Sequence, residues 1–153
     1  MADTSLNENR LALLIWQTSN LWQSKVRQKL KESEITLNEY LILETIYLLQ
    51  QQKLNITQKD ICINASIDRS VVSLRVSSLE EKKLISKQQP QDKRSDSLIL
   101  SEAGNNLINN IIDNIVELEN ELFNKLGSEI FNFTNSLKLL LGKKIRIRAK
   151  LND

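Results

Sequence analysis

The chain has 153 residues, which corresponds to about one domain at the usual ~150 residues per domain. Hydrophobic residues make up 41% of it and charged residues 26%, with three glycines and one proline, a composition that excludes collagen-like, Pro/Gly-rich disordered and turn-dense all-β proteins and favours helices. The net charge is only +2, but residues 57–100 hold eight basic groups against six acidic ones and residues 101–129 hold one against six, so a polyanion would avoid the latter segment.

The residue types that are missing exclude most enzyme chemistry. A single cysteine and no histidine leave no intramolecular disulfide, no Cys/His zinc site and no Ser/His or Cys/His catalytic pair. We therefore predict a protein that is not an enzyme and has no metal or cofactor. The longest uninterrupted apolar stretch, residues 11–16, is far below the ~18 residues of a membrane span, which predicts a cytoplasmic protein with no membrane partner.

Three helix starts can be read in the first half of the chain. Apolar residues recur at helical spacing from Leu11, which predicts a long first helix to about residue 31. A second helix is expected at Thr36, because the sequence T-L-N-E is a capping box in which the threonine hydroxyl and Glu39 bond the backbone reciprocally. Thr57 begins a similar pattern, which predicts a short helix of about seven residues with Ile61 pointing inward.

The next helix completes a helix-turn-helix. Asp68 is the expected cap, and Val72, Val76 and Leu79 lie within about 30° of one direction on a helical wheel. Two short helices joined by a tight turn are the signature of this motif.

The second half of the chain predicts a β-wing followed by two helices. Residues 84–89 and 97–101 read as strands, and the turn-forming residues between them read as a polar tip. After Ser101 a long helix has an apolar arc of about half the wheel, whereas one contact surface needs only about 100°. The surplus apolar surface predicts a second subunit. A last helix is expected from Ser128, and the sequence after Gly142 is ambiguous between helix and extended tail.

This order of elements resembles the MarR family of winged-helix repressors, and three local motifs carry the resemblance. Residues 35–43, I-T-L-N-E-Y-L-I-L, are similar to the family pattern L-T-x-x-Q-x-x-V-L. Leu79-Glu80 with residues 84–87, L-I-S-K, is similar to L-E…G-L-I-x-R. The most specific match is Asp92-Lys-Arg94-Ser followed by residues 98–104, L-I-L-S-E-A-G, which is similar to D-x-R-S…V-x-L-T-x-x-G.

The resemblance implies a mainly α fold: a winged helix-turn-helix with a two-stranded β-wing, flanked by N- and C-terminal dimerisation helices. Residues 1–153 would form a single MarR-like unit, with a DNA-binding lobe at 36–100 and helical dimerisation regions at 1–35 and 101–153. The implied function is sequence-specific binding of double-stranded DNA by a homodimeric repressor on a palindromic operator. The alternative is a helical protein-interaction adaptor with no DNA role.

The predicted DNA-binding residues lie on the recognition helix and the wing. On the helix, the side chains that point away from the predicted core are Ser70, Ser73, Leu74 and Ser77, while Arg75 lies about 60° off the core direction, where it could reach phosphate. On the wing they are Lys87, Asp92, Lys93 and Arg94, with Arg94 implied as the minor-groove arginine and Asp92 as the organiser of the tip.

Two positions depart from the family pattern. The family commonly has Arg where this chain has Leu74, which changes the expected base preference. Lys83 replaces the glycine that usually ends the recognition helix, and a left-handed lysine there would cost roughly 1 kcal/mol relative to glycine.

Aromatic residues on the first two helices suggest an effector site. Family members form a pocket beneath the DNA-binding lobe for small phenolic or aromatic acids, and the resemblance implies Trp16, Tyr40 and Tyr47 as its candidates here. Core packing is the alternative explanation for these aromatics. Cys62 is expected to be a small buried packing residue.

Overall fold

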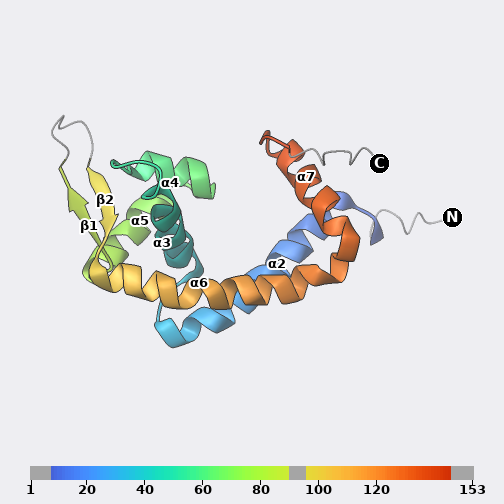
Figure 1. The fold of residues 1–153 in the computed structure, drawn as a ribbon, viewed down its shortest axis with the longest axis horizontal. Coiled ribbons are helices and arrows are strands. Elements are labelled where there is room, and N and C mark those ends of the chain that lie inside the picture. Colours follow the sequence, from blue (N-terminus) through green and yellow to red (C-terminus); the bar gives the residue numbers. More distant parts are fainter. Residues whose placement is uncertain (1–7, 90–95, 146–153) are drawn as a thin grey trace, which may run out of the picture. The chain divides into compact units, whose positions relative to one another are not determined.

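The structure, a computed structural model, describes residues 8–89 and 96–145 and is drawn in Figure 1. The chain divides into two compact units, residues 1–116 and 117–153. The first unit holds the following elements in chain order: α2 (Leu11–Leu30), the 3₁₀ turn η1 (Lys31–Ser33), α3 (Leu37–Leu49), α4 (Gln58–Ala65), α5 (Arg69–Glu81), β1 (Ile85–Gln88), β2 (Ser97–Leu100) and most of α6 (Glu102–Phe123). The second unit holds the end of α6, the 3₁₀ segment η2 (Asn124–Glu129) and α7 (Ile130–Leu140). The predicted mainly α fold with a two-stranded wing is confirmed.

The predicted capping boxes are present at two helix starts. At α3 the Thr36 N–H donates to Glu39 Oε1 at 2.9 Å, and the Glu39 N–H donates to Thr36 Oγ1 at 3.2 Å. Thr57 and Asp60 make the same pair of bonds at α4. The prediction that Asp68 caps α5 is only half correct: Asp68 is the N-cap residue, but its carboxylate makes no capping hydrogen bond.

The core of the first unit forms around α3. This helix buries Ile42, Leu43 and Ile46 completely and contacts α2, α4, α5 and β2. The residues predicted to face inward from α4 and α5 are also fully buried: Ile61, Val72, Val76 and Leu79. The prediction of the helix-turn-helix core from the apolar pattern is therefore confirmed. Because these side chains are buried, the opposite face of α5 is the one exposed to solvent.

The wing strands pair in antiparallel register. Ile85 is opposite Leu100, and Gln88 is opposite Ser97. The Leu98 N–H donates to the Ile56 carbonyl at 2.7 Å, which ties β2 to the chain segment before α4. Leu98 and Ile85 are buried, so the base of the wing belongs to the core. The tip predicted at 90–96 lies outside the described residues except for Asp96.

A tight junction connects the wing to α6. The Ser101 N–H donates to the Leu84 carbonyl at 2.9 Å, and the Ser101 hydroxyl donates to the Lys83 carbonyl at 2.7 Å while it accepts from the Gly104 N–H at 3.0 Å. A Cβ at Gly104 would run into the Leu84 carbonyl oxygen. The Ser-x-x-Gly sequence is thus explained by close approach of two backbones at this corner.

The exposed large apolar side chains are concentrated in the terminal helices. In the first unit, α2 buries Val26 and Leu30 near its C-terminal end, and its first half exposes a set of large residues: Leu11, Leu14, Ile15, Trp16 and Leu21. In the second unit, α7 buries no residue and is separated from α6 by Gly127, whose φ of 53° and ψ of −127° break the helix. No helix among the described residues is long and apolar enough to cross a membrane.

Candidate nucleic-acid interface

The outer face of α5 presents the side chains predicted from the sequence. Ser70, Ser73, Leu74 and Ser77 are all exposed, and Leu74 keeps 62% of its surface accessible. The opposite face of the helix is buried in the core through Val72, Val76 and Leu79. An apolar side chain this exposed, bracketed by short hydroxyls, forms a shallow surface that can approach base edges in a major groove.

Two of the predicted residues have restricted side chains. The Ser77 hydroxyl donates to the Ser73 carbonyl at 3.2 Å, so it is left mainly as an acceptor. Arg75 is half-buried, and its Nε is buried without a hydrogen-bond partner among the described residues. A buried donor without a partner costs about 1–3 kcal/mol, which favours any rearrangement that gives this guanidinium an acceptor.

The wing contributes Lys87 from β1. Its Nζ lies 3.3 Å from Glu80 Oε1 on α5, a partly exposed ion pair that links the recognition helix to the wing. Ion pairs near the surface contribute only about 0–1 kcal/mol to stability. A DNA phosphate could therefore replace Glu80 as the partner of Lys87 at little cost in free energy. The other predicted wing residues, Asp92, Lys93 and Arg94, lie outside the described residues.

A cationic hollow beside the recognition helix was not predicted. It has a volume of about 340 Å³ and is lined by Lys59 near the start of α4, Cys62, and Arg69 at the start of α5. The signal that could have identified it is a basic residue in the first turn of both helices of the motif, where backbone N–H groups also favour anions. Cys62 is half-buried rather than fully buried as expected, because Ile61 takes the inward position and the next residue is rotated by about 100°.

A buried carboxylate fixes the C-terminal end of the recognition helix. Glu39 is 1% exposed; its Oε2 accepts from the Ser78 hydroxyl at 3.0 Å, and its Oε1 accepts from Lys82 Nζ at 3.0 Å. Burial raises the pKa of Glu39, but hydrogen bonds from Thr36 N–H, Lys82 and Ser78, together with the Lys82 charge, outweigh that effect and lower the pKa below the ordinary 4.5. The sequence identified Glu39 as a cap but not as the anchor of α5, since Lys82 is 43 residues away.

Lys83, which stands where the family usually has glycine, has the left-handed backbone conformation that was expected at the end of α5. Lys83 has a φ of 59°, in the left-handed region that favours glycine. Its N–H donates to the Glu80 carbonyl at 2.9 Å, so the helix ends there even without the glycine.

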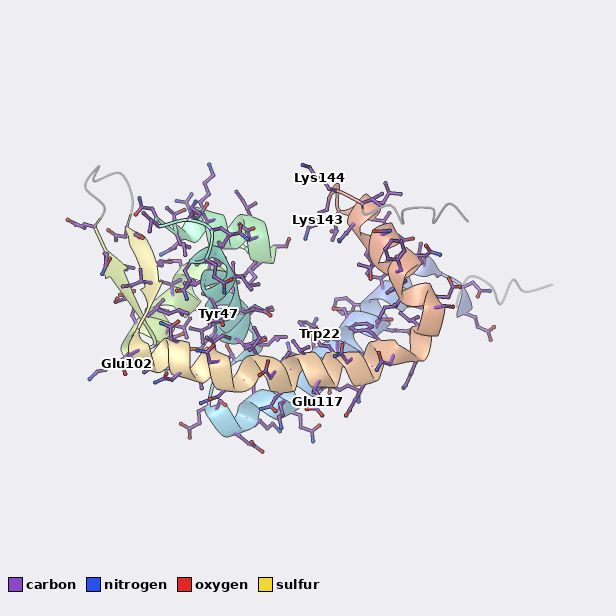
Figure 2. All side chains as sticks on the ribbon, viewed as in Figure 1. Trp22, Tyr47, Glu102, Glu117, Lys143 and Lys144 are labelled. Atoms are coloured by element: carbon purple, nitrogen blue, oxygen red, sulfur yellow. The ribbon has the colours of Figure 1, made fainter. Side chains whose placement is uncertain are left out.

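The three candidate pocket aromatics differ in exposure. Tyr40 is 1% exposed, with its hydroxyl 3.4 Å from Glu44 Oε1, and therefore belongs to the core of α3. Trp16 on α2 is 63% exposed. Tyr47, labelled on α3 in Figure 2, is half-buried. An effector site formed by these residues stays a prediction.

The sequence is similar to that of one curated DNA-binding regulator over about two thirds of its length. No family model matches the chain. An uncharacterised HTH-type transcriptional regulator of Bacillus subtilis, YdcH, is 31% identical over 96 residues, which cover 62% of this chain and 65% of that protein. The match thus spans slightly less than two thirds of the curated relative.

Solved structures extend the similarity over most of the chain. Staphylococcus aureus MepR in complex with DNA is 26% identical, with a TM-score of 0.77 over 86% of this chain and 94% of that one. A MarR-family regulator from Rhodococcus sp. RHA1 has the same fold at 15% identity, with a TM-score of 0.76 over 90% of this chain and 96% of that one. The chain thus has the winged-helix fold of these proteins and is similar to regulators of the MarR family. Its MarR-type homologues are transcriptional regulators, not enzymes, in agreement with the sequence prediction.

Proposed function

We propose that this chain is a transcriptional regulator of the MarR family that binds double-stranded DNA through the outer face of α5 and through the wing. The observation that carries the proposal is the exposed row Ser70, Ser73, Leu74 and Ser77 on a helix whose inner face is completely buried. MepR, a homologue of the same fold, has been solved in complex with DNA. Such a regulator acts in the cytoplasm, where bacterial DNA is located.

The proposed DNA-binding form is a homodimer on a palindromic operator, and its regulatory effect is repression. Residues 36–100 would form the DNA-binding lobe, and residues 1–35 and 101–153 the dimerisation regions. The exposed apolar side chains of α2 and α7 support this division, because several large apolar side chains exposed on one helix are typical of subunit interfaces. Two-fold symmetry would place the two recognition helices about one DNA turn apart.

Different residues are assigned different parts of the DNA. Arg94 would enter the minor groove, with Asp92 and Lys93 at the same wing tip, and Lys59, Arg69, Arg75 and Lys87 would contact phosphates. Leu74 and Ser73 would read thymine methyl groups and base-edge acceptors, which favours an A/T-rich half-site.

A small phenolic or aromatic acid is the proposed effector, on the strength of the family resemblance, with Trp16, Tyr40 and Tyr47 as its candidate contacts. It would weaken DNA binding by preferring a dimer whose recognition helices are wrongly spaced. Quenching of tryptophan fluorescence by such an acid, together with loss of DNA binding, would support this part of the proposal.

Selection of bound duplexes from a random DNA pool tests the function. We expect an A/T-rich palindrome, and a protein that enriches no sequence at low salt would contradict the proposal. Arg94→Ala should weaken binding to the selected duplex and to unrelated duplexes alike. It should also reduce the slope of log K against log salt concentration by about one, because one positive charge near the phosphates is lost. Arg27→Ala on α2 is the matched control and should leave the slope unchanged.

The proposed repression and dimerisation have separate tests. Transcription in vitro from a promoter that carries the selected palindrome should fall as the protein is added. Sedimentation at micromolar concentration should show a dimer. A monomer that still binds a palindrome would show that the dimerisation proposal is wrong.

A further inference from the structure

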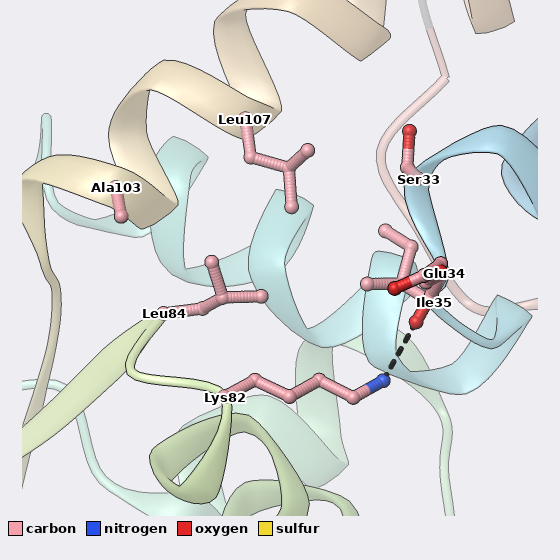
Figure 3. A pocket seen from close by; sticks show the side chains of 7 residues that line it. All are labelled: Ser33, Glu34, Ile35, Lys82, Leu84, Ala103 and Leu107. Carbon is pink, nitrogen blue, oxygen red and sulfur yellow. Dashed lines mark hydrogen bonds between the residues drawn. The ribbon is translucent and has the colours of Figure 1, made fainter.

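The C-terminal end of the recognition helix α5 is bonded to the corner between α2 and α3. Lys82, the residue after α5, donates from its ammonium group to the main-chain carbonyl of Glu34 at 2.8 Å and to Glu39 Oε1 at 3.0 Å. Glu34 directly follows η1 and has a φ of 55°, where the chain turns from α2 towards α3. Figure 3 shows the Lys82 side chain reaching this turn. One ammonium group therefore joins the end of α5 to the end of α2 and to the start of α3.

A second bond on the same face of α5 restricts the rotation of the helix. Ser78 lies four residues before Lys82, and side chains with this separation are neighbours on a helix surface. The Ser78 hydroxyl donates to Glu39 Oε2 at 3.0 Å, so both oxygens of one carboxylate accept bonds from α5 or from the residue that follows it. Glu39 is 1% exposed and is itself fixed by its capping bonds with Thr36. Rotation of α5 about its axis would break at least one of these bonds.

The chain that leaves α5 is bonded to the start of α6. The Ser101 hydroxyl donates to the Lys83 carbonyl at 2.7 Å, and the Ser101 N–H donates to the Leu84 carbonyl at 2.9 Å. Gly104 of α6 lies so close to the Leu84 carbonyl that a Cβ would meet it. The turn before α3, the end of α5 and the first turns of α6 also line one hollow, so the three segments meet at one place (Figure 3). No flexible linker therefore separates the recognition helix from α2 or from α6.

We infer that these bonds of Ser78, Lys82 and Ser101, here called the α5 anchor, determine which spacing between two operator half-sites the protein accepts. This role depends on the proposed DNA-binding dimer, in which α2 and α6 belong to the dimerisation regions. Because α5 is bonded to both regions, the anchor sets the direction in which each recognition helix leaves the dimer. The three side chains are positioning residues, since none of them belongs to the exposed row of α5 that is proposed to face the bases.

The geometry of DNA makes spacing a strict requirement for an anchored helix. One base pair more or less between the half-sites moves them by about 3.4 Å along the DNA axis and rotates one relative to the other by about 35°. The bonds of the α5 anchor are 2.7–3.0 Å long, and a shift of about 0.5 Å already takes such bonds beyond their normal range. A pair of recognition helices held in this way cannot follow the change, so one half-site loses its base contacts.

The test compares three duplexes with the full chain: the selected palindrome, and the same duplex with one base pair inserted or deleted at its centre. Wild type should bind both altered duplexes at least about 10-fold more weakly, a loss comparable to that from a mismatched base pair. Lys82→Met removes both bonds of the ammonium group and should reduce this discrimination at least about 3-fold, because the lobe can then turn towards the displaced half-site. Ser101→Ala should act in the same direction from the α6 side.

Two further variants separate the orientation of α5 from affinity and stability. Lys82→Arg keeps the charge and the hydrogen-bond donors, so it should restore most of the discrimination. Lys87→Met is the matched control: it removes another lysine that is paired with a glutamate, and it should weaken binding to all three duplexes by the same factor. A partly unfolded variant also loses affinity for all duplexes by one factor, so the ratio of Kd values is independent of stability.

Two results would overturn the inference. One is a wild type that binds the three duplexes equally, and the other is full discrimination in both Lys82→Met and Ser101→Ala. A failure of the proposed function looks different, because such a protein would bind none of the three duplexes at low salt.

Discussion

The bond between Lys82 and Glu39 gives a sharp test of how the recognition helix is held. Lys82→Met keeps a long apolar side chain but removes the ammonium that lies 3.0 Å from Glu39 Oε1. The carboxylate, 1% exposed, would keep its bonds from Thr36 N–H and Ser78 but lose its counter-charge. This substitution therefore separates the ion pair from the capping box.

The magnitude follows from the burial of the two partners. Removing one partner of a fully buried pair costs about 3–5 kcal/mol, and an exposed pair contributes about 0–1 kcal/mol. The Lys82 side chain is 39% exposed while Glu39 is buried, so we expect an intermediate loss of about 2 kcal/mol. For a chain of this length, that corresponds to a fall in Tm of roughly 4–8 °C.

The assay is denaturant unfolding at fixed protein concentration, followed by circular dichroism between pH 7 and pH 3. The pKa of Glu39 is lower in the folded chain than its ordinary 4.5, so its contribution to stability is present above pH 4.5 and is lost as pH falls through the folded pKa. The difference between wild type and Lys82→Met should therefore shrink as Glu39 becomes protonated. Lys29→Met, at an exposed position of α2, is the control. A variant as stable as wild type at pH 7, or a deficit that persists unchanged at pH 3, would refute this reasoning.

Three further substitutions test other features. Gly104→Ala should destabilise the fold by about 1–3 kcal/mol or more in thermal unfolding, because the added Cβ meets the Leu84 carbonyl; a neutral effect would contradict the described junction. Lys83→Gly should raise the free energy of unfolding by about 1 kcal/mol, since φ is 59°, and a loss of stability would show that the lysine side chain matters more than its backbone strain. Leu74→Arg should shift the selected half-site towards guanine at one symmetric position, with discrimination of about 1–3 kcal/mol. An unchanged selected sequence would show that Leu74 does not face the bases.

Local patterns in the sequence determined most of the first unit. Thr36 with Glu39, and Thr57 with Asp60, are three residues apart, so their capping bonds follow from helix geometry alone. Val72, Val76 and Leu79 share one face of a helix for the same reason, which also identified Ser70, Ser73, Leu74 and Ser77 as the outward residues.

Only the tertiary structure decided which distant residues meet. Lys82 reaches Glu39 across 43 positions, and Lys59 and Arg69 line one hollow because α4 and α5 pack together. No local periodicity contains this information, since it depends on how two helices cross and on where their side chains end. The hollow lined by Ile35, Leu84 and Leu107 (Figure 3) likewise exists only once the wing, α6 and the turn before α3 have packed together.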